Sequence, residues 1–456
     1  MKDLSLFEIA TACNGTLNNK DYGDFHITSI TTDSRKISDK TLFVPLKGSK
    51  VDGHDFIMKT FESGAVCSLS EKDVVTDKPV IKVKSCYQAV KDIAEYYRSL
   101  FHIPFIGISG SVGKTSTKEM IASVLSQKFK VHKTQGNFNN ELGVPLTLFG
   151  LEEYHEVAVI EMGISDFGEM TRLSKMVRPD ICVITSIGDC HLENLGDRDG
   201  VLKAKTEMFT YRNKNGKIFL CGDNPHLATV KRVDDTQTVF YGIENNGINT
   251  YYAKDIVNKS ADGISCTLCT PNEKFTVTIP AIGNYMVANA LVGVAIGEYL
   301  GMNAESMAKG VTSYKTVGSR DGIIKTDFLT IIDDCYNASP ISVRGGVDNI
   351  NTFKGRKVCI LGDMKELGKN SRQLHFETGE YVKSQNIDVL IAIGTLAKDL
   401  ADGCQGGNTT VYWFETVEKA KENLKNILLK NDNVLVKASR AMRFENVVSF
   451  LKEISL

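Results

Sequence analysis

Apolar residues recur along the chain with two spacings, which predict alternating strands and helices. Short, near-continuous apolar runs such as FIGISG, VAVIEMG and ICVITSIG are typical of strands buried on both faces of a parallel sheet. Between them lie stretches with apolar residues at helical spacing, such as SVGKTSTKEMIASVLSQKF. The pattern therefore predicts an α/β fold with doubly wound parallel sheets.

Changes in this pattern divide the chain into three domains and one connecting helix. Short strand signals in TLFVPLKG, AVCSLS and PVIKVK follow a helical LSLFEIATACNG, while FLTIIDD, KVCILGD, DVLIAIG and NVLVKAS form a later set of buried strands. The predicted units are a small N-terminal α/β domain at 1–85, a connecting amphipathic helix at 86–103, a central P-loop domain at 104–313 and a C-terminal Rossmann-like domain at 314–456.

Length and charge agree with this division and exclude several classes of protein. The chain has 456 residues, enough for about three domains. Its formal net charge is −1, so no global basic field would hold nucleic acid or an anionic membrane. No apolar run reaches the roughly 18 residues of a spanning helix, and the N-terminus lacks the apolar core of a signal peptide. We expect a cytoplasmic monomer with no nucleic-acid partner and no membrane insertion.

The cysteines give no sign of a disulfide framework or a zinc site. Eleven of them are spread over the chain, which in a cytoplasmic protein favours reduced, individually buried thiols. Cys266 and Cys269 form one CxxC pair, but neither a second pair nor nearby histidines complete a metal site.

The strongest motif is a glycine-rich loop between a predicted strand and a predicted helix, GISGSVGKTST. Its backbone N–H groups and the helix N-terminus would bind phosphate, Lys114 would neutralise the outer phosphates, and the Thr115 hydroxyl would ligate Mg²⁺. The common spacing would place a glycine at position 108, where this chain has isoleucine, so a generic small GTPase is disfavoured. The nucleotide-binding residues expected here are Gly110, Ser111, Val112, Gly113, Lys114, Thr115 and Ser116.

Two further polar residues follow apolar strands at the same predicted sheet edge. Glu161 ends VAVIEMG, and His191 comes just after ICVITSIG. A phosphate-bound Mg²⁺ needs carboxylate help from a neighbouring strand end, and a buried carboxylate is costly without a cation or donor. Their position favours metal ligands over isolated structural residues.

These motifs, taken in order along the chain, resemble the Mur ligases, the ATP-dependent amide-bond enzymes of peptidoglycan precursor synthesis. The matching pieces are GISGSVGKTST, TQGNFNNELGVPLTL, VIEMG, CHLENLG, LKAKTEMF, DDCYNASP, LGDMKELG and KASRAMRFE, and they cover nearly the whole chain. NFNNELGVPLTL, DDCYNASP and LGDMKELG resemble the branch that adds D-alanyl-D-alanine to UDP-N-acetylmuramoyl-tripeptide. The resemblance implies ATP, two Mg²⁺ ions and a lysine carbamylated by CO₂.

The resemblance also implies roles for particular residues. Thr115 and Glu161 would bind one Mg²⁺, and His191 with carbamylated Lys205 a second. Catalytic roles fall to Lys114, Lys205, His191 and Arg320. The other implied contacts are with ATP at Asn289, Arg320, Asp334, Tyr336 and Asn337, and with the UDP-linked substrate at Ser34, Arg35, Gly48, Asp52, His54, Asn139 and Asn140. The family often has His-Asn where this chain has Tyr285-Met286, so no nucleotide contact is assigned to those two.

Some of these residues have simpler interpretations that the sequence leaves open. Asn139 and Asn140 could cap a helix, and Ser34 with Arg35 could be turn residues. Asp334 could be a solvated strand end. His375, in RQLHFETG, could be an ordinary helical residue, and Lys203 could be a solvated or phosphate-side lysine. Lys203 and Lys205 would point about 200° apart on a helix, so only one of them can readily face the metal.

The implied reaction activates a carboxylate as an acyl phosphate, which an amine then attacks. Closure of the three domains would exclude water from this intermediate. Two alternatives remain: a P-loop ATPase or nucleotide-gated binding module without ligase activity, and a ligase that adds a diamino acid to the dipeptide precursor.

Overall fold

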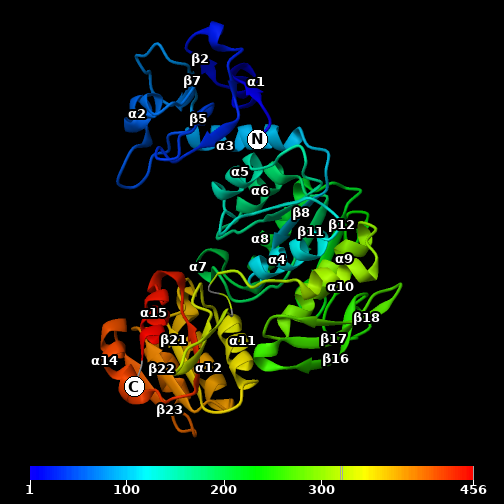
Figure 1. The fold of residues 1–456 in the computed structure, drawn as a ribbon, viewed down its shortest axis with the longest axis vertical. Helices are drawn as coiled ribbons and strands as arrows, with labels where there is room; N and C mark the ends of the chain where they lie inside the picture. Colours follow the sequence, from blue (N-terminus) through cyan, green and yellow to red (C-terminus); the bar gives the residue numbers. More distant parts are fainter. Residues whose placement is uncertain (319, 321, 455–456) are drawn as a thin grey trace.

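The computed structural model describes residues 1–318, 320 and 322–454. Figure 1 shows three α/β parts following one another along the long axis, with the N-terminal part and the C-terminal part at opposite ends. The central part lies between them and carries a small antiparallel sheet at its side. The predicted α/β class is confirmed.

The N-terminal part is built around a five-stranded sheet of order β2-β7-β6-β5-β4, in which only β2 runs antiparallel to its neighbour. Its first helix begins at a capping box in which Ser5 and Glu8 satisfy each other's backbone N–H groups. The elements are β1 (Leu4–Ser5), α1 (Leu6–Ala12), β2 (Thr16–Leu17), β3 (His26–Ile27), β4 (Ser29–Thr31), β5 (Thr41–Phe43), α2 (Ile57–Glu62), β6 (Cys67–Ser70) and β7 (Val80–Lys82).

Helix α3 (Cys86–Ser99) joins this part to the centre. Its apolar face, including Val90, Ile93 and Tyr97, belongs to one continuous core with the N-terminal sheet and one face of the central sheet. The buried Tyr97 hydroxyl donates to the carbonyl of Leu151, 2.8 Å away. The helix expected at this position is therefore present and is packed against both neighbours.

The central sheet has six parallel strands in the order β15-β12-β11-β8-β10-β9. Alternate residues of each strand enter different cores: Phe105 lies on the α3 side, and Ile106 and Ile108 on the α4 side. The strands are β8 (Phe105–Ser109), β9 (Val131–Lys133), β10 (Val157–Glu161), β11 (Ile181–Ile184), β12 (Lys217–Cys221) and β15 (Val239–Tyr241).

Helices cover both faces of this sheet, as the near-continuous apolar strands predict. The helices are α4 (Lys114–Leu125), α5 (Gly143–Phe149), α6 (Glu169–Val177), α7 (Leu192–Leu195), α8 (Arg198–Thr206), α9 (Tyr285–Tyr299) and α10 (Ala304–Thr312).

Sequence analysis did not find the antiparallel sheet β16-β17-β18, which lies over α9 and α10. A register shift between Lys254 and Val257 breaks the polar-apolar alternation of its first strand, which weakens the sequence signal. Cys266 and Cys269 lie buried in β17, as structural residues. The strands are β16 (Tyr252–Asn258), β17 (Ile264–Cys269) and β18 (Lys274–Ile279), with a separate hairpin of β13 (Arg232–Val233) and β14 (Thr236–Gln237).

The C-terminal sheet has the order β19-β20-β24-β21-β22-β23 and is parallel except for the edge strand β19. Its two faces pack into separate cores. The elements are β19 (Gly322–Lys325), β20 (Leu329–Asp333), α11 (Pro340–Asn351), β21 (Lys357–Gly362), α12 (Ser371–Ser384), β22 (Val389–Ile393), α13 (Ala397–Cys404), β23 (Thr410–Phe414), α14 (Val417–Ile427), β24 (Asp432–Lys437) and α15 (Glu445–Glu453).

All eleven cysteines are free, and nine are buried; Cys190 and Cys221 are half-buried. No helix among the described residues combines the length and apolar character needed to span a membrane.

Candidate active site

The glycine-rich loop connects the end of β8 to the start of α4. Gly110 and Gly113 have φ of +152° and +83°, which side chains rarely tolerate. A Cβ atom at position 110 would lie 2.0 Å from Thr185 Oγ1, so the loop backbone needs glycine to pass this close to the residues after β11. The loop is held by Ser111 N–H donating to Ser186 O at 2.9 Å and Val112 N–H to Ser186 Oγ at 3.0 Å.

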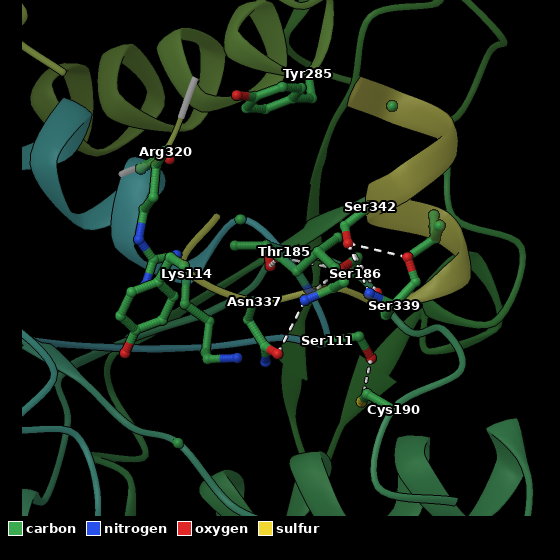
Figure 2. Close-up of a pocket in the computed structure, with 18 of the residues that line it drawn as sticks. Ser111, Lys114, Thr185, Ser186, Cys190, Tyr285, Arg320, Asn337, Ser339 and Ser342 are labelled. Carbon is green, nitrogen blue, oxygen red and sulfur yellow. Dashed lines mark hydrogen bonds between the residues drawn. The ribbon is translucent and has the colours of Figure 1, made fainter. Parts of the chain in front are cut away.

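Lys114, labelled in Figure 2, starts α4. It folds back over this loop, and its Nζ donates to Gly110 O at 2.7 Å. Burial lowers the pKa of Lys114, although nearby Glu161 opposes the shift. No side chain in the described part of the chain caps the N-terminus of α4. Its first backbone N–H groups are therefore not occupied by a side-chain acceptor. An uncapped helix N-terminus beside a lysine suits phosphate oxygens.

Glu161, 1% exposed, ends β10 beside the start of α4. Thr115 Oγ1 donates to its two carboxylate oxygens at 2.9 and 3.1 Å, and Asn139 Nδ2 donates to Oε1 at 2.8 Å. The buried Lys118 ammonium lies 3.8 Å from Oε2 and donates to Thr134 O at 2.7 Å. Hydroxyl and carboxylate oxygens are the hard ligands that Mg²⁺ prefers, so the residues present fit this ion.

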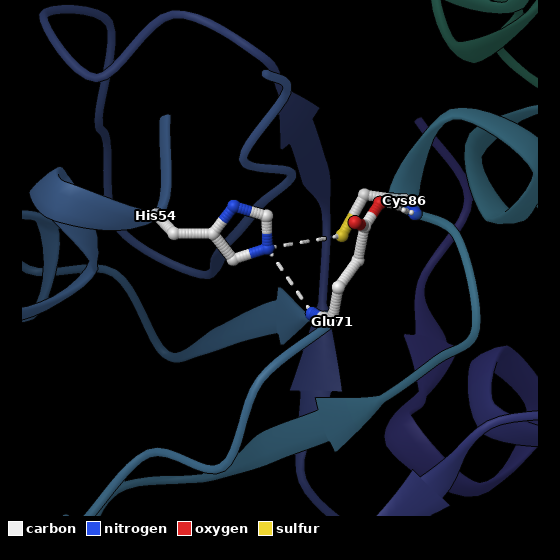
Figure 3. A group of neighbouring side chains, drawn as sticks. All are labelled: His54, Glu71 and Cys86. Atoms are coloured by element: carbon white, nitrogen blue, oxygen red, sulfur yellow. Dashed lines mark hydrogen bonds between the residues drawn. The ribbon is translucent and has the colours of Figure 1, made fainter. Parts of the chain in front are cut away.

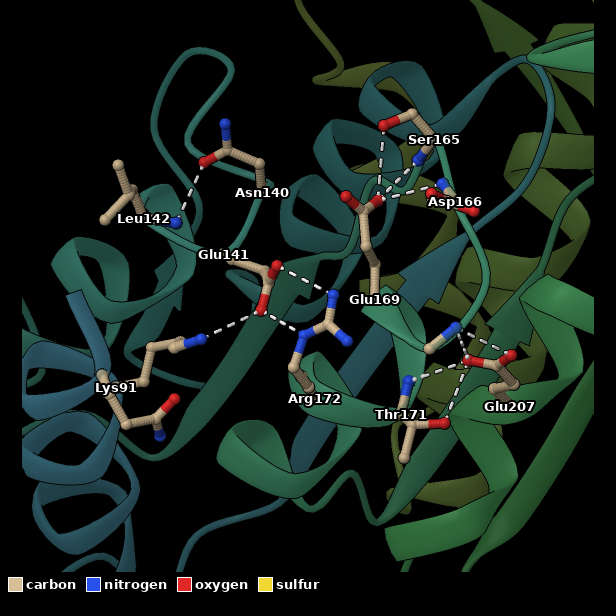
Figure 4. Close-up of polar contacts among 12 residues, drawn as sticks. Lys91, Asn140, Glu141, Leu142, Ser165, Asp166, Glu169, Thr171, Arg172 and Glu207 are labelled. Atoms are coloured by element: carbon tan, nitrogen blue, oxygen red, sulfur yellow. Dashed lines mark hydrogen bonds and ion pairs between the residues drawn. The ribbon is translucent and has the colours of Figure 1, made fainter. Parts of the chain in front are cut away.

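The loop that carries Asn139 is fixed by an ion-pair network (Figure 4). Glu141 contacts Lys91 of α3 at 3.2 Å and Arg172 of α6 at 2.6 Å. Asn140 Oδ1 accepts from Leu142 N–H and Gly143 N–H at the start of α5, at 3.2 and 2.8 Å. Asn140 thus bonds to the N-terminus of a helix, as a capping residue would. Asn139 instead bonds to Glu161.

Lys205 and Lys203 lie on the same helix, α8, but in opposite environments. Lys205 is 1% exposed and Lys203 is exposed, which confirms their expected separation around the helix. Within the described residues, Lys205 has no ion-pair partner. Desolvation lowers the pKa of Lys205 to about 8. A neutral amine is therefore accessible near neutral pH.

His191 follows β11 and directs Nδ1 toward Glu366 of the C-terminal domain, 2.7 Å from Oε2. This contact crosses the gap between the two domains. Hydrogen bonding to His191 lowers the pKa of Glu366. Next to His191, the Cys190 thiol donates to Ser111 Oγ at 3.1 Å, which links this segment to the glycine-rich loop (Figure 2).

The C-terminal domain contributes a second wall. The Arg320 guanidinium stacks on the Tyr336 ring, 3.9 Å from its centroid, and Lys437 forms an ion pair with Asp334. Lys437 also donates to Asn337 O at 3.1 Å. These contacts place Arg320 over the same open space as Lys114 (Figure 2).

Both walls enclose one cavity of about 1070 Å³. Three predicted site residues, Thr115, Lys205 and Gly110, are not among the residues that line it. The predicted residues that line it are Ser111, Val112, Gly113, Lys114, Ser116, Asn139, Asn140, Glu161, His191, Asn289, Arg320, Asp334, Tyr336 and Asn337.

Asn289 reaches the cavity from α9 and is 6% exposed. Its Oδ1 accepts from Thr117 Oγ1 of α4 at 2.8 Å, and its Nδ2 contacts Met286 Sδ at 3.3 Å. The side chain thus fixes α9 against the phosphate-loop helix and helps to form the cavity wall.

The predicted uridine-nucleotide residues lie in the N-terminal domain and do not line this cavity. Arg35 pairs with Asp33 at 2.8 Å, and Asp52 pairs with His54 at 2.6 Å. His54 Nε2 accepts from Glu71 N–H at 3.1 Å and lies 3.9 Å from Cys86 Sγ (Figure 3). These bonds occupy both ring nitrogens of His54. The other two residues of the predicted set are Ser34 and Gly48, whose N–H donates to Val51 O at 2.9 Å.

Comparison with known proteins agrees with this geometry. Models of the Mur ligase family match at residues 26–98 (catalytic domain), 108–297 (middle domain) and 294–440 (glutamate ligase domain). The UDP-N-acetylmuramoyl-tripeptide--D-alanyl-D-alanine ligase of Bacillus subtilis is 37% identical over 98% of this chain and 97% of its own. The chain belongs to the Mur ligase family.

Solved structures of Mur ligases show the same fold. MurF from Acinetobacter baumannii aligns over 100% of both chains with a TM-score of 0.93 and 28% identity. MurF ligase from Thermotoga maritima, solved in complex with ADP, aligns over 93% of this chain and 97% of its own, with a TM-score of 0.83 and 28% identity. The three-domain arrangement of this Mur ligase is therefore shared with its relatives.

Among the residues of the site in this Mur ligase that were not predicted from the sequence are Tyr285, Lys118 and Glu366. Tyr285 lines the cavity at the start of α9, although no contact was assigned to it. Lys118 lies one helical turn beyond Lys114, and that spacing is a signal that could have found it. Glu366 stands in the quoted motif LGDMKELG, but only the fold brings it to His191.

Proposed function

We propose that this Mur ligase uses ATP to join D-alanyl-D-alanine to UDP-N-acetylmuramoyl-tripeptide, releasing ADP and phosphate. The observation that carries the proposal is the single cavity that unites the phosphate loop, Glu161 and Arg320. The choice of substrates is supported by full-length similarity to relatives named for this reaction. In this proposal, residues 1–85 bind the UDP-linked substrate, 86–103 form the connector, 104–313 bind ATP, and 314–456 close over the site.

The reaction must bring a carboxylate close to ATP phosphates, all of them negative. Lys114 and Arg320 approach the same cavity from opposite domains and offset that repulsion. The terminal carboxylate of the tripeptide takes the γ-phosphoryl group to become an acyl phosphate. The free amine of the dipeptide then attacks its carbonyl carbon, the amide bond forms and phosphate leaves.

The hydroxyl and carboxylate oxygens of Thr115 and Glu161 fit one divalent cation, and the proposal adds a second. Thr115 and Glu161 would hold one Mg²⁺, and His191 with a carbamate on Lys205 would hold the second. When bound, the ions neutralise phosphate charge and the charge that develops on the transferred group. Asn139 keeps Glu161 oriented through its 2.8 Å hydrogen bond.

The remaining predicted residues complete the binding surface. Asn289 lies beside the adenine, and Asp334, Tyr336 and Asn337 close over the nucleotide. Ser34, Arg35, Gly48, Asp52 and His54 bind the uridine nucleotide, with Asn139 and Asn140 toward the peptide end. Domain closure excludes water from the acyl phosphate. A monomer in the cytoplasm remains the prediction for the working enzyme.

Carbamylation of Lys205 is supported by its environment. A buried ammonium without an ion-pair partner is costly, and the lowered pKa makes the neutral amine available to CO₂. The carbamate presents oxygens to a cation where an ammonium would repel it. With ¹³C-labelled CO₂, NMR should show a carbamate signal in the wild type and in Lys203→Ala, but not in Lys205→Ala. A Lys205 that stays unlabelled in an active enzyme would overturn this part of the proposal.

A phosphate-release assay tests the proposed function. Phosphate release should require ATP, UDP-N-acetylmuramoyl-tripeptide and D-alanyl-D-alanine together. The Lys114→Ala variant should release phosphate only at the background rate. Release with L-lysine or diaminopimelate and the dipeptide precursor would instead identify a diamino-acid ligase. Release that needs neither substrate would identify a P-loop ATPase.

A further inference from the structure

Glu366 is the one carboxylate that the C-terminal domain places against His191, among the described residues. Its Oε2 lies 2.7 Å from His191 Nδ1, and both residues line the cavity. His191 follows β11 of the central domain, and Glu366 follows β21 of the C-terminal domain. The contact therefore joins the cavity's two walls at a residue proposed to bind a cation.

Both partners are held in a backbone conformation that is unfavourable for their residue types. His191 has φ of +52° and Glu366 has φ of +64°. Residues other than glycine rarely adopt this left-handed region, because the Cβ atom comes too close to the following carbonyl oxygen. Strain of this kind persists where surrounding structure imposes it, and it is concentrated at functional sites. Backbone strain in both members of this interdomain pair indicates that the pair has a function.

The loop that carries Glu366 is fixed from behind. Met364 N–H donates to Nε2 of the fully buried His375 at 2.9 Å, and His375 Nδ1 bonds Ser371 O at 2.7 Å. His375 is thus more than an ordinary helical residue: it anchors this loop. Leu367, 2% exposed, packs into the same core as Met364.

The loop also meets the central domain through its backbone. Gly368 begins the short helical turn η6 (Gly368–Asn370), and a Cβ there would lie 3.3 Å from the Glu193 N and Cα atoms of α7. That close approach brings Glu366 to His191 by backbone packing. A flexible surface ion pair would not need such a fit.

The chemistry of the pair follows from which ring nitrogen is engaged. A carboxylate that accepts from Nδ1–H fixes the neutral imidazole tautomer whose Nε2 carries the lone pair. Metal-binding histidines are commonly oriented by a carboxylate in this way, and loss of that partner costs about 10- to 100-fold in metal affinity or activity.

We propose that Glu366 is a positioning residue that holds His191 Nε2 ready for a divalent cation, so that the C-terminal domain completes a cation site in the central domain. This inference rests on the proposed function, because that function makes His191 a cation ligand. It adds that cation binding at His191 depends on how the C-terminal domain is docked.

The test uses the full-length protein and Mn²⁺ as the probe, with ADP present and no turnover. Mn²⁺ affinity is measured by electron paramagnetic resonance, and the tautomer of His191 by ¹⁵N NMR of histidine-labelled protein, assigned with His191→Asn. The variants are Glu366→Ala, Glu366→Gln and, as a matched control on α7, Glu193→Gln.

Glu366→Ala should weaken Mn²⁺ binding at least about 10-fold and lose the Nδ1–H tautomer. Glu366→Gln should retain part of both, because its amide oxygen still accepts a hydrogen bond, and Glu193→Gln should match the wild type. If His191→Asn weakens Mn²⁺ binding but Glu366→Ala leaves affinity and tautomer unchanged, the inference fails while the proposed function stands. If His191→Asn itself has no effect on Mn²⁺, the proposed cation role of His191 fails and the inference fails with it.

Discussion

The two walls of the cavity differ in how their charged groups are held. On the central wall, Glu161 is 1% exposed and is bonded by Thr115 and Asn139 of the same domain. On the C-terminal wall, Arg320 is half-buried on a tyrosine ring and the Glu366 side chain is 61% exposed. The central wall is preorganised, whereas the C-terminal wall acquires its full set of contacts through the position of a domain. Changes to the central wall should impair binding and chemistry together, whereas loss of Arg320 from the C-terminal wall should impair mainly turnover.

Lys114→Ala should have the largest effect. It removes the lysine charge of the phosphate loop, so ligation should fall toward background, a loss of about 10²–10³-fold by analogy with removal of one preorganised transition-state donor. Phosphate release and circular dichroism should be measured together. A folded variant with near-wild-type release would contradict the preorganised central wall.

Lys205→Met should also lose activity heavily, while Lys203→Met should lose much less. Lys205→Met should also stabilise the protein against unfolding in CO₂-depleted buffer. Because the folded-state pKa of about 8 is below the ordinary lysine value of 10.5, the buried ammonium destabilises the fold below pH 8. That penalty disappears as the pH rises from about 8 to 10.5.

The stabilisation at pH 7 should be on the order of 3 kcal/mol, from 1.36 kcal/mol per pKa unit. Urea unfolding at pH 7 and pH 10 measures it, with Lys203→Met as the exposed control. Equal stability of the Lys205 variant and the wild type at pH 7 would show that Lys205 is not a buried charge.

Arg320→Ala tests the C-terminal wall of the cavity in the same way as Lys114→Ala tests the central wall. Turnover should fall by about 10²-fold or more, because charge compensation is lost only when the domains enclose the substrates. Affinity for the UDP-linked tripeptide should change little. Calorimetry and steady-state kinetics give the two quantities, and equal losses in both would argue against a role limited to closure.

Asn139→Ala and Asn140→Ala form the smallest and most closely matched pair. Asn139→Ala removes a donor to Glu161 and should raise the Mg²⁺ concentration needed for half-maximal activity. Asn140→Ala removes the bonds at the start of α5 and should cost about 1 kcal/mol of stability with little change in the Mg²⁺ requirement. Mg²⁺ titrations and thermal unfolding of both variants separate these effects; a reversed pattern would exchange the two assignments.

The features that sequence predicted correctly are contiguous ones. The loop from Gly110 to Ser116 forms where a strand signal meets a helix signal, and its glycines meet a local steric requirement. The buried strands are also local signals, since their apolar runs need no knowledge of their partners. Helical spacing predicted that Lys203 and Lys205 lie on different sides of a helix, and the family resemblance predicted that Lys205 faces inward; the structure has Lys205 buried and Lys203 exposed.

The features that sequence missed depend on distant residues. Nothing in the sequence around Glu366 indicates a partner. The contact with His191 forms only because the fold brings the ends of β21 and β11 together. Strand β16 is interrupted by a register shift, so its pairing with β17 decides its structure more than its own pattern does. The polar residues of the N-terminal domain bond to one another, and the uridine-nucleotide site there stays a prediction.

The continuous core beneath helix α3 has a consequence for how the molecule comes apart. Because Val90, Ile93 and Tyr97 pack at once against the N-terminal sheet and the central sheet, those two parts should lose structure in one cooperative transition. The C-terminal sheet packs into two further cores, joined by Ile282 of the central part in one of them, so it should open and exchange its amide hydrogens largely separately. Mild proteolysis should then degrade the C-terminal part first, leaving one fragment that carries the substrate end together with the phosphate loop.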